Sequence, residues 1–269
     1  GLVMRIISWE ELVGSPSPLF APGLKVAATI GVFDGVHLGH QELLRRVVER
    51  GGPQSVVITF RQSPKAVFAP DHFPGYLFSL EQRLTVFESL SVSLVCMIDF
   101  SEKFGTLGGK DFISLIQDRL KLRYLAIGSN FRCGYGLDTD SSRIASMNRD
   151  FGSETDIVPP VMVGGEPVSS SRIRTAMAAG DLVEARALSG RDIELDLVAV
   201  PTTPGPEGVD YDAGAVKRLA PPPGRYAVTY FCDDVPPFRG FADISGTRIR
   251  CPRGQIKRVR FDVDPSRGN

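Results

Sequence analysis

The sequence predicts an α/β fold, in which a doubly wound parallel sheet is followed by a small antiparallel β domain. Over roughly the first 190 residues, short apolar runs rich in β-branched residues alternate with amphipathic windows. After Arg191, proline and glycine become frequent, and the strand-like runs that follow have no convincing helix between them. We therefore expect two domains, residues 1–191 and residues 192–269, of which the second is small for an independent core.

The expected elements follow the chain in order. In the first domain we expect strands at 25–33, 54–60, 93–100 and 123–130, and helices at 40–51, 80–90 and 109–121. In the second domain we expect strands at 225–231, 238–244, 247–251 and 256–263. Helical crossovers make the strands of the first domain parallel, and sheets of this kind bind ligands in the loops after the carboxyl ends of their strands.

The composition is that of an ordinary soluble globular protein, with 42% hydrophobic and 23% charged residues. No apolar run approaches the roughly 20 residues that cross a bilayer, so we expect no membrane partner. The four cysteines form no CxxC pair and the first residues do not resemble an export signal, which favours a reducing cytoplasm. The 31 basic and 31 acidic residues balance, so no nucleic-acid partner is expected, and the basic segment IKRVRFDV is interpreted as a half-exposed strand.

Residues 29–40 read TIGVFDGVHLGH and carry the first candidate site. The strand is expected to lead into a turn with Gly31, Gly35 and Gly39, and a helix is expected to start at or near His40. The free amides of a helix start attract anions. His37 and His40 can donate hydrogen bonds to phosphate oxygens, and one that becomes cationic can stabilise charge that builds up in a transition state.

Two other interpretations of this segment stay open. A zinc site would need further ligands, and His72, the only other histidine, lies in the loop-like PDHFPG segment. The simpler alternative is a helix cap beside a packed histidine. Three glycines next to two histidines favour phosphate binding over both.

A second candidate phosphate element is VSSSRIR at residues 168–174. A run of serines that opens a helix is ordinarily an N-cap. Arg174, however, follows Ser170 and Ser171 by four and three residues, which places a forked cation on the same helix face as the two hydroxyls. This combination suits a triphosphate.

The GxFDGxHxGH pattern resembles the signature of the HxGH nucleotidyltransferases, and the full wording resembles bacterial FAD synthetases, which are bifunctional riboflavin kinases and FMN adenylyltransferases. Further motifs follow in the family's order: VITFRQSP resembles TFxPxP, IGSNFRCG resembles GxNFRFG, VSSSRIR resembles ISSTxIR, and GDLVEARALSGR resembles GDLxxAxxLLGR. Arg61-Gln62-Ser63-Pro64 keeps one of two prolines, and Cys133 replaces an aromatic residue. The resemblance covers residues 25–191 and implies a Rossmann-like fold for them.

The resemblance implies that ATP and FMN react to FAD and pyrophosphate, with Mg²⁺ held mainly by the phosphates and no metal site built from protein ligands. The implied catalytic residues are His37, His40, Ser171 and Arg174. The implied ATP-binding residues are Gly31, Phe33, Asp34, Gly35, His37, Gly39, His40, Ser170, Ser171 and Arg174. The implied flavin-binding residues are Thr59, Phe60, Pro64, Asn130 and Phe131; without the resemblance, Phe131 is interpreted as a core residue.

The second domain resembles a degenerate riboflavin kinase. PGRYAVTY and FRGFADI resemble strands of that module, but residues 196–207 lack the glycine-rich opening and the PTAN tetrad. No segment matches the family's C-terminal helix or catalytic glutamate, so we expect the kinase activity to be lost. Thr202 and Thr203 are interpreted as part of an ordinary loop.

Two alternatives to FMN adenylylation remain. One is an HxGH transferase with another acceptor, against which the order of the motifs argues. The other is a non-catalytic flavin or nucleotide sensor, which the altered Arg61–Pro64 loop and the eroded second domain suggest. An intact set of His37, Gly39, His40, Ser171 and Arg174 favours the enzyme. The sequence carries no signal for an oligomeric state.

Overall fold

The computed structural model describes residues 3–100 and 102–264, which form two compact units. The first unit comprises the residues up to 33, residues 39–73 and residues 84–161. The second comprises residues 34–38, residues 74–83 and the chain from residue 162 onward. Each unit contains its own main sheet.

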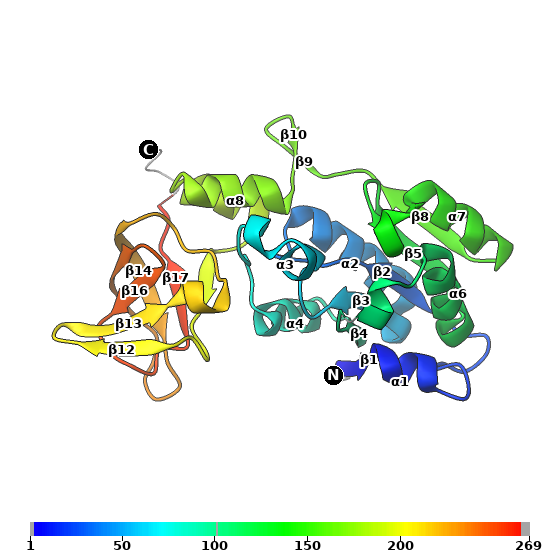
Figure 1. Cartoon of the computed structure of the whole chain (residues 1–269), viewed down its shortest axis with the longest axis horizontal. Coiled ribbons are helices and arrows are strands. Elements are labelled where there is room, and N and C mark those ends of the chain that lie inside the picture. Colours follow the sequence, from blue (N-terminus) through cyan, green and yellow to red (C-terminus); the bar gives the residue numbers. More distant parts are fainter. Residues whose placement is uncertain (1–2, 101, 265–269) are drawn as a thin grey trace. The chain divides into compact units, whose positions relative to one another are not determined.

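The first unit is built on a parallel sheet of six strands (Figure 1). The strands are β1 (Arg5–Ser8), β2 (Ala27–Ile30), β3 (Ser55–Phe60), β4 (Leu94–Ile98), β5 (Tyr124–Gly128) and β8 (Glu154–Val158), in the order β1-β4-β3-β2-β5-β8. The chain goes from β2 outward through β3 to β4, and later continues on the other side of β2 with β5 and β8. The strand order therefore reverses beside β2, which confirms the predicted doubly wound, Rossmann-like sheet.

The helices of the first 161 residues are α1 (Trp9–Gly14), α2 (Leu38–Gly51), α3 (Pro64–Phe68), α4 (Leu80–Ser89), α5 (Glu102–Gly105), α6 (Gly109–Leu120) and α7 (Ser141–Asp150). A short hairpin of β6 (Arg132–Cys133) and β7 (Thr139–Asp140) precedes α7. The three predicted helices are confirmed as α2, α4 and α6, and α2 begins two residues earlier than expected. Of the α-helices and strands described in the first unit, eight were not predicted from the sequence: α1, α3, α5, α7, β1, β6, β7 and β8.

Helices cover both faces of the parallel sheet. On one face, Trp9 of α1, Phe112 of α6 and Ile144 of α7 join the core formed by alternate residues of the strands. On the other face, Gly51 of α2 lies so close to β2 that an added Cβ would meet the Ala27 side chain at 2.9 Å. Burial on both faces explains why the central strands are almost wholly apolar.

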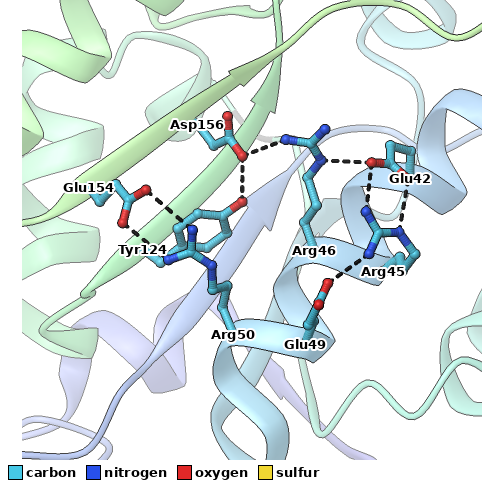
Figure 2. A network of polar contacts seen from close by, with 8 residues as sticks. All are labelled: Glu42, Arg45, Arg46, Glu49, Arg50, Tyr124, Glu154 and Asp156. Atoms are coloured by element: carbon cyan, nitrogen blue, oxygen red, sulfur yellow. Dashed lines mark hydrogen bonds and ion pairs between the residues drawn. The ribbon is translucent and has the colours of Figure 1, made fainter.

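A polar network ties the second half of α2 to β5 and β8 (Figure 2). Arg46 donates to Asp156 at 2.6 Å, and Tyr124 donates to the same carboxylate oxygen at 2.9 Å. Arg50 donates to Glu154 at 3.2 Å, and its guanidinium lies 4.7 Å from the centre of the Tyr124 ring. Burial, with Asp156 adding to it, raises the pKa of Tyr124 to about 12, so the phenol stays a donor. The network fixes the orientation of the helix that carries His40 in its first turn.

The second unit contains an antiparallel sheet of seven strands (Figure 1). Its strands are β11 (Glu194–Asp196), β12 (Thr202–Gly205), β13 (Gly208–Asp212), β14 (Gly224–Phe231), β15 (Phe238–Ser245), β16 (Arg248–Cys251) and β17 (Arg258–Phe261), in the order β11-β17-β14-β15-β16-β13-β12. The same unit contains α8 (Ser170–Ala178), α9 (Leu182–Ser189) and a hairpin of β9 (Met162–Val163) and β10 (Glu166–Pro167). The four predicted strands are confirmed as β14 to β17.

Thr202 and Thr203, expected in a loop, lie in β12, and Pro204 beside them is tolerated because β12 is an edge strand. The strand β17 is half-exposed, as expected, and the guanidinium groups of Arg258 and Arg260 lie 4.1 Å and 5.5 Å from the centre of the Phe231 ring. Their charges therefore serve packing within the sheet.

Candidate active site

The segment between β2 and α2 lies where the strand order of the parallel sheet reverses, and its backbone is unusual. Phe33, Gly35 and Val36 all have positive φ, at 58°, 81° and 36°. Only glycine adopts such angles without cost, and non-glycine residues held there cluster at functional sites. An added Cβ on Gly35 would also meet Leu77 at 3.0 Å. The geometry of the turn therefore depends on this glycine.

Asp34 holds the turn in place through its carboxylate. The residue is buried, with 5% of its surface exposed. The carboxylate accepts hydrogen bonds from the backbone N–H groups of Leu77 and Phe78 at 3.1 Å and 2.9 Å, and it pairs with Arg174. Burial raises the pKa of Asp34, while Arg174 and the two amides oppose that rise. The carboxylate thus faces inward, toward the protein.

Arg174 of α8 completes this arrangement. Its Nη2 group donates to Asp34, and its Nε group donates to the Gly75 carbonyl at 3.0 Å. Among the residues that the structure describes, Nη1 has no hydrogen-bond partner. Asp34 and Gly75 therefore fix the plane of the guanidinium while one of its edges stays available to an anion.

The three serines that open α8 have separate roles. Ser169 is the N-cap, and its hydroxyl accepts from the Arg172 amide at 3.1 Å. The Ser170 hydroxyl donates to the Asp34 carbonyl at 2.9 Å. Ser171 is exposed, and within the described chain its hydroxyl makes no hydrogen bond. The capping interpretation is thus correct for Ser169, while Ser170 supports the turn and Ser171 is accessible.

His37 immediately precedes α2 and is buried, with 6% of its surface exposed. Burial, with a smaller effect of the positive charge of Arg174, lowers the pKa of His37 to about 4. The imidazole is therefore neutral at pH 7 and donates through a single N–H group. A cationic His37 would require proton uptake when an anion binds.

This pKa predicts how stability depends on pH. Between pH 7 and pH 5 the unfolded chain protonates His37, whose ordinary pKa is 6.5, while the native protein does not, so the free energy of unfolding should fall by about 2 kcal/mol. Urea unfolding at both pH values checks this against His37→Gln, in which that loss should be absent. His72→Gln, at an exposed position, is the matched control and should keep the wild-type loss. Equal losses in His37→Gln and in the wild type would contradict the assignment.

Four of the predicted ATP-binding residues belong to the first unit. Phe33 is fully buried, and the centre of its ring lies 5.2 Å from that of His40 and 5.6 Å from that of Phe87. An added Cβ on Gly31 would meet the Phe33 ring at 3.1 Å. Gly39 and His40 lie in the first turn of α2 and are half-buried. Phe33 therefore supports His40 from inside the fold.

The predicted flavin-binding residues differ in how accessible they are. Thr59 is fully buried and donates to the Val32 carbonyl at 3.2 Å, and Pro64 begins α3. Asn130 is exposed after β5, whereas Phe131 packs against the hydrophobic core, as its sequence position alone suggested. Of these four, Asn130 is the one whose side chain is exposed.

The altered loop after β3 is held by the end of the neighbouring strand. Arg61 pairs with Asp99 at 3.0 Å, and the Gln62 amide group donates to the same carboxylate at 3.2 Å. Gln62 also accepts from the Phe100 amide at 3.4 Å. Arg61 and Gln62, the second of which stands where the family's pattern has a proline, thus anchor this loop to the segment after β4.

Phe60 belongs to an aromatic group that the sequence analysis only partly identified. Its ring stacks on Phe100 at 4.8 Å, and Phe100 also contacts Phe68 and Phe104, each at 5.6 Å. Phe68 is 63% exposed. The sequence contained a signal for this group, because the four phenylalanines lie at or after the ends of the consecutive strands β3 and β4. The loops after parallel strands meet at one edge of a sheet, so these rings could be expected to lie close together.

The predicted residues therefore fall into two sets. Asp34, Gly35, His37, Ser170, Ser171 and Arg174 belong to the second unit, where Asp34 directly contacts Ser170 and Arg174. Gly31, Phe33, Gly39, His40, Thr59, Phe60, Pro64, Asn130 and Phe131 belong to the first unit. The sequence analysis missed Gly75, Leu77 and Phe78, whose backbone groups bind Arg174 and Asp34.

Across the described residues, no three His, Cys, Asp or Glu side chains come together in a way that could hold a metal ion. No helix in the described part of the chain has the length and apolar character needed to span a membrane. The second unit thus brings the turn at residues 34–38 and the start of α8 together with a fixed arginine, which is an arrangement suited to binding phosphate groups.

Comparison with known proteins agrees with this class of site. Residues 23–172 match the family model described as FAD synthetase. A bifunctional riboflavin kinase/FMN adenylyltransferase of Escherichia coli (strain K12) is 30% identical over 235 residues, which are 85% of this chain and 75% of the relative. The protein of the same name from Bacillus subtilis (strain 168) is 28% identical over 76% of this chain and 67% of its own length.

The structural comparison agrees in fold. A crystal structure described as a macrolide-efflux protein from Streptococcus pneumoniae has a TM-score of 0.74 and 22% identity, and the match covers 97% of this chain and 90% of that chain. At this identity the likeness concerns the fold alone. Site and fold together define a nucleotide-binding α/β protein with an appended antiparallel sheet. The chain belongs to the FAD synthetase family.

Proposed function

We propose that this protein is an FMN adenylyltransferase, which makes FAD and pyrophosphate from FMN and ATP. The observation that carries the proposal is the HxGH turn at the point where the order of the parallel strands reverses, in a chain whose residues 23–172 match the FAD synthetase model. The E. coli and B. subtilis relatives bear this activity in their names. We propose that the reaction takes place in the cytoplasm.

In the proposed reaction, an oxygen of the FMN phosphate attacks the α-phosphorus of ATP, and pyrophosphate leaves. The nucleophile is already an anion, so no general base is needed, and the protein contributes alignment and neutralisation of charge. His37 and His40 donate to the reacting phosphate. The Nη1 group of Arg174, the Ser171 hydroxyl and the first amides of α8 bind the β- and γ-phosphates.

The second substrate is proposed to bind through the first unit. The aromatic group of Phe60, Phe68, Phe100 and Phe104 offers apolar surface for a flavin ring, and the exposed Asn130 offers an amide. Thr59 and Pro64 shape the loop beside this group. We propose that a Mg²⁺ ion arrives with ATP and is held by phosphate oxygens and water, because Mg²⁺ gives up its water reluctantly.

We also propose that the riboflavin kinase activity of the relatives is lost. Residues 196–207 lack the family's phosphate-binding wording, and Thr202 and Thr203 are exposed in the edge strand β12. Two exposed hydroxyls on an edge strand do not form a cradle for a triphosphate.

One experiment tests both the adenylyltransferase activity and the loss of kinase activity. Purified protein with Mg²⁺ and ATP receives either FMN or riboflavin, and flavin products are separated by chromatography. We expect FAD and an equal amount of pyrophosphate from FMN, and no FMN or FAD from riboflavin. FMN formed from riboflavin would refute the loss of kinase activity, and transfer to another phosphate acceptor but not to FMN would refute the adenylyltransferase assignment.

A further inference from the structure

We infer that the C-terminal antiparallel sheet positions the ATP-binding part of the proposed active site through residues 74–83, which we call the strap. The inference rests on the proposed function, because it assigns the Asp34–Arg174 pair to ATP binding. The strap, residues 34–38 and the chain from residue 162 onward belong to one compact unit. Every contact in the argument lies within that unit.

The strap is bonded to the C-terminal part of the chain by its backbone. The Tyr76 amide donates to the Lys217 carbonyl at 2.7 Å, and the Leu219 amide donates to the Tyr76 carbonyl at 2.9 Å. Gly75 has a φ of +109°, and a Cβ there would approach the Lys217 carbonyl to 3.2 Å. The first half of the strap therefore lies directly against residues 217–219.

Side chains hold the second half of the strap to the end of β11. The Ser79 hydroxyl donates to the Asp196 carboxylate at 2.5 Å, and both residues are buried. Arg218 donates to the Asp196 carbonyl at 2.9 Å, so it binds the same residue from the other side. The Gln82 amide group donates to the Glu194 carbonyl at 3.3 Å. Asp196 is thus the point where strap and sheet are joined by buried polar bonds.

The groups that hold the proposed ATP site lie between these two attachments or, in the case of Gly75, directly before the first. The amides of Leu77 and Phe78 donate to Asp34, and Gly75 accepts from Arg174. Tyr76 and Ser79 flank these two amides. Tyr76 is hydrogen-bonded to residues 217 and 219, and Ser79 is hydrogen-bonded to Asp196. Since neighbouring Cα atoms are about 3.8 Å apart, the amides cannot shift without disturbing those bonds.

The consequence is a continuous chain of contacts from Asp196 through Ser79 and the strap amides to Asp34, and from there to Arg174. Loss of the Asp196 side chain leaves the bonds of Arg174 to Asp34 and Gly75 but removes the Ser79 bond that holds the strap, on which Gly75 and the two amides lie. The sheet therefore contributes to adenylyl transfer without touching a substrate. This role explains how a domain without kinase chemistry still serves the reaction.

Isothermal titration calorimetry with MgATP alone tests the role of Asp196. Asp196→Ala is expected to raise the Kd for MgATP about tenfold. Asp210→Ala is the matched control, because it breaks the ion pair of Asp210 with Arg250 at 2.8 Å in the same sheet, and within the described chain Asp210 makes no hydrogen bond to the strap. This control should keep the Kd within about twofold of the wild type, although both variants lose stability.

A second pair of variants covers the possibility that Asp196→Ala does not fold. Ser79→Ala removes the strap's hydroxyl, and Ser89→Ala removes a hydroxyl at the other end of α4 that donates to the Val86 carbonyl. Only Ser79→Ala should weaken MgATP binding. In the enzyme assay it should raise KM for ATP while leaving KM for FMN within about twofold, a split that general destabilisation would not give.

The inference is overturned if folded Asp196→Ala and Ser79→Ala both bind MgATP as tightly as the wild type. It is also overturned if wild-type protein does not bind MgATP, or if Asp210→Ala weakens binding as much as Asp196→Ala. Wild-type protein that binds MgATP but forms no FAD would refute the proposed function alone. In that case the binding comparison still decides whether the sheet positions the ATP site.

Discussion

Replacing His37 with alanine is expected to lower kcat for FAD formation by about 10²- to 10³-fold, the loss found when one donor to a developing negative charge is removed. His37 is buried at the start of α2, behind a turn whose backbone is fixed by positive φ angles. In the proposed reaction, its N–H group is therefore oriented before charge develops on the reacting phosphate. KM for FMN should stay within about threefold, and steady-state rates of FAD and pyrophosphate formation measure both constants.

Two controls separate this role from a structural one. His72→Ala, at an exposed position, should keep the wild-type kcat, and His37→Gln should recover part of the rate because it keeps a side-chain donor. Since burial lowers the pKa of His37 to about 4, the pH profile of kcat/KM should show no ionisation of His37 between pH 6 and pH 8. A kcat for His37→Ala within threefold of the wild type would contradict the proposed role.

The central elements of the fold were predictable because burial on two faces leaves a strong local signal. All six residues of β3, SVVITF, are buried, and such a run identifies a central parallel strand. In the edge strands β1 and β8, most residues are at least partly exposed to solvent. Their sequences, RIIS and ETDIV, therefore lack that signal. The helix α7, SSRIASMNRD, is mostly polar, and it is recognised by its Asp140 cap rather than by periodicity.

The hairpin of β12 and β13 shows how turn residues can mislead. Thr202 and Thr203 were interpreted as part of a loop, yet they pair with Tyr211 and Asp210. Proline is compatible with β12 because that strand has a neighbour on one side only. Position at the edge of a sheet is a tertiary property, so the sequence of the segment does not reveal it.

The parts of the candidate site that lie close together in the sequence were predictable, whereas contacts between residues far apart in the sequence were not. Two histidines and three glycines within twelve residues are visible in the sequence, but Leu77 and Phe78, the partners of Asp34, are 43 and 44 residues away from it. Arg174 is 140 residues from Asp34. The sequence indicated that both charged residues belong to the site; their direct pairing required the fold.

Replacing Asp34 with alanine is expected to lower the free energy of unfolding by about 3–5 kcal/mol, the largest effect on stability that we predict. The substitution leaves the Arg174 guanidinium, 16% exposed, without its carboxylate partner, and it leaves the Leu77 and Phe78 amides without their acceptor. A buried charge and buried donors that lose their partner cost far more than an exposed pair would. Urea unfolding at pH 7 measures the difference from the wild type.

The asparagine variant shows which part of this loss comes from charge. Asp34→Asn keeps an oxygen that can accept from the strap amides but no negative charge for Arg174, so we expect about half the loss of Asp34→Ala. Glu49→Ala breaks the exposed pair of Glu49 with Arg45, whose side chains are 67% and 58% exposed, and should cost less than about 0.5 kcal/mol. If Asp34→Ala were no more costly than Glu49→Ala, the pair would not hold the turn. Arg174 would then need another source of its fixed orientation, and the path of contacts from the C-terminal sheet to the ATP site would be broken at its central residue.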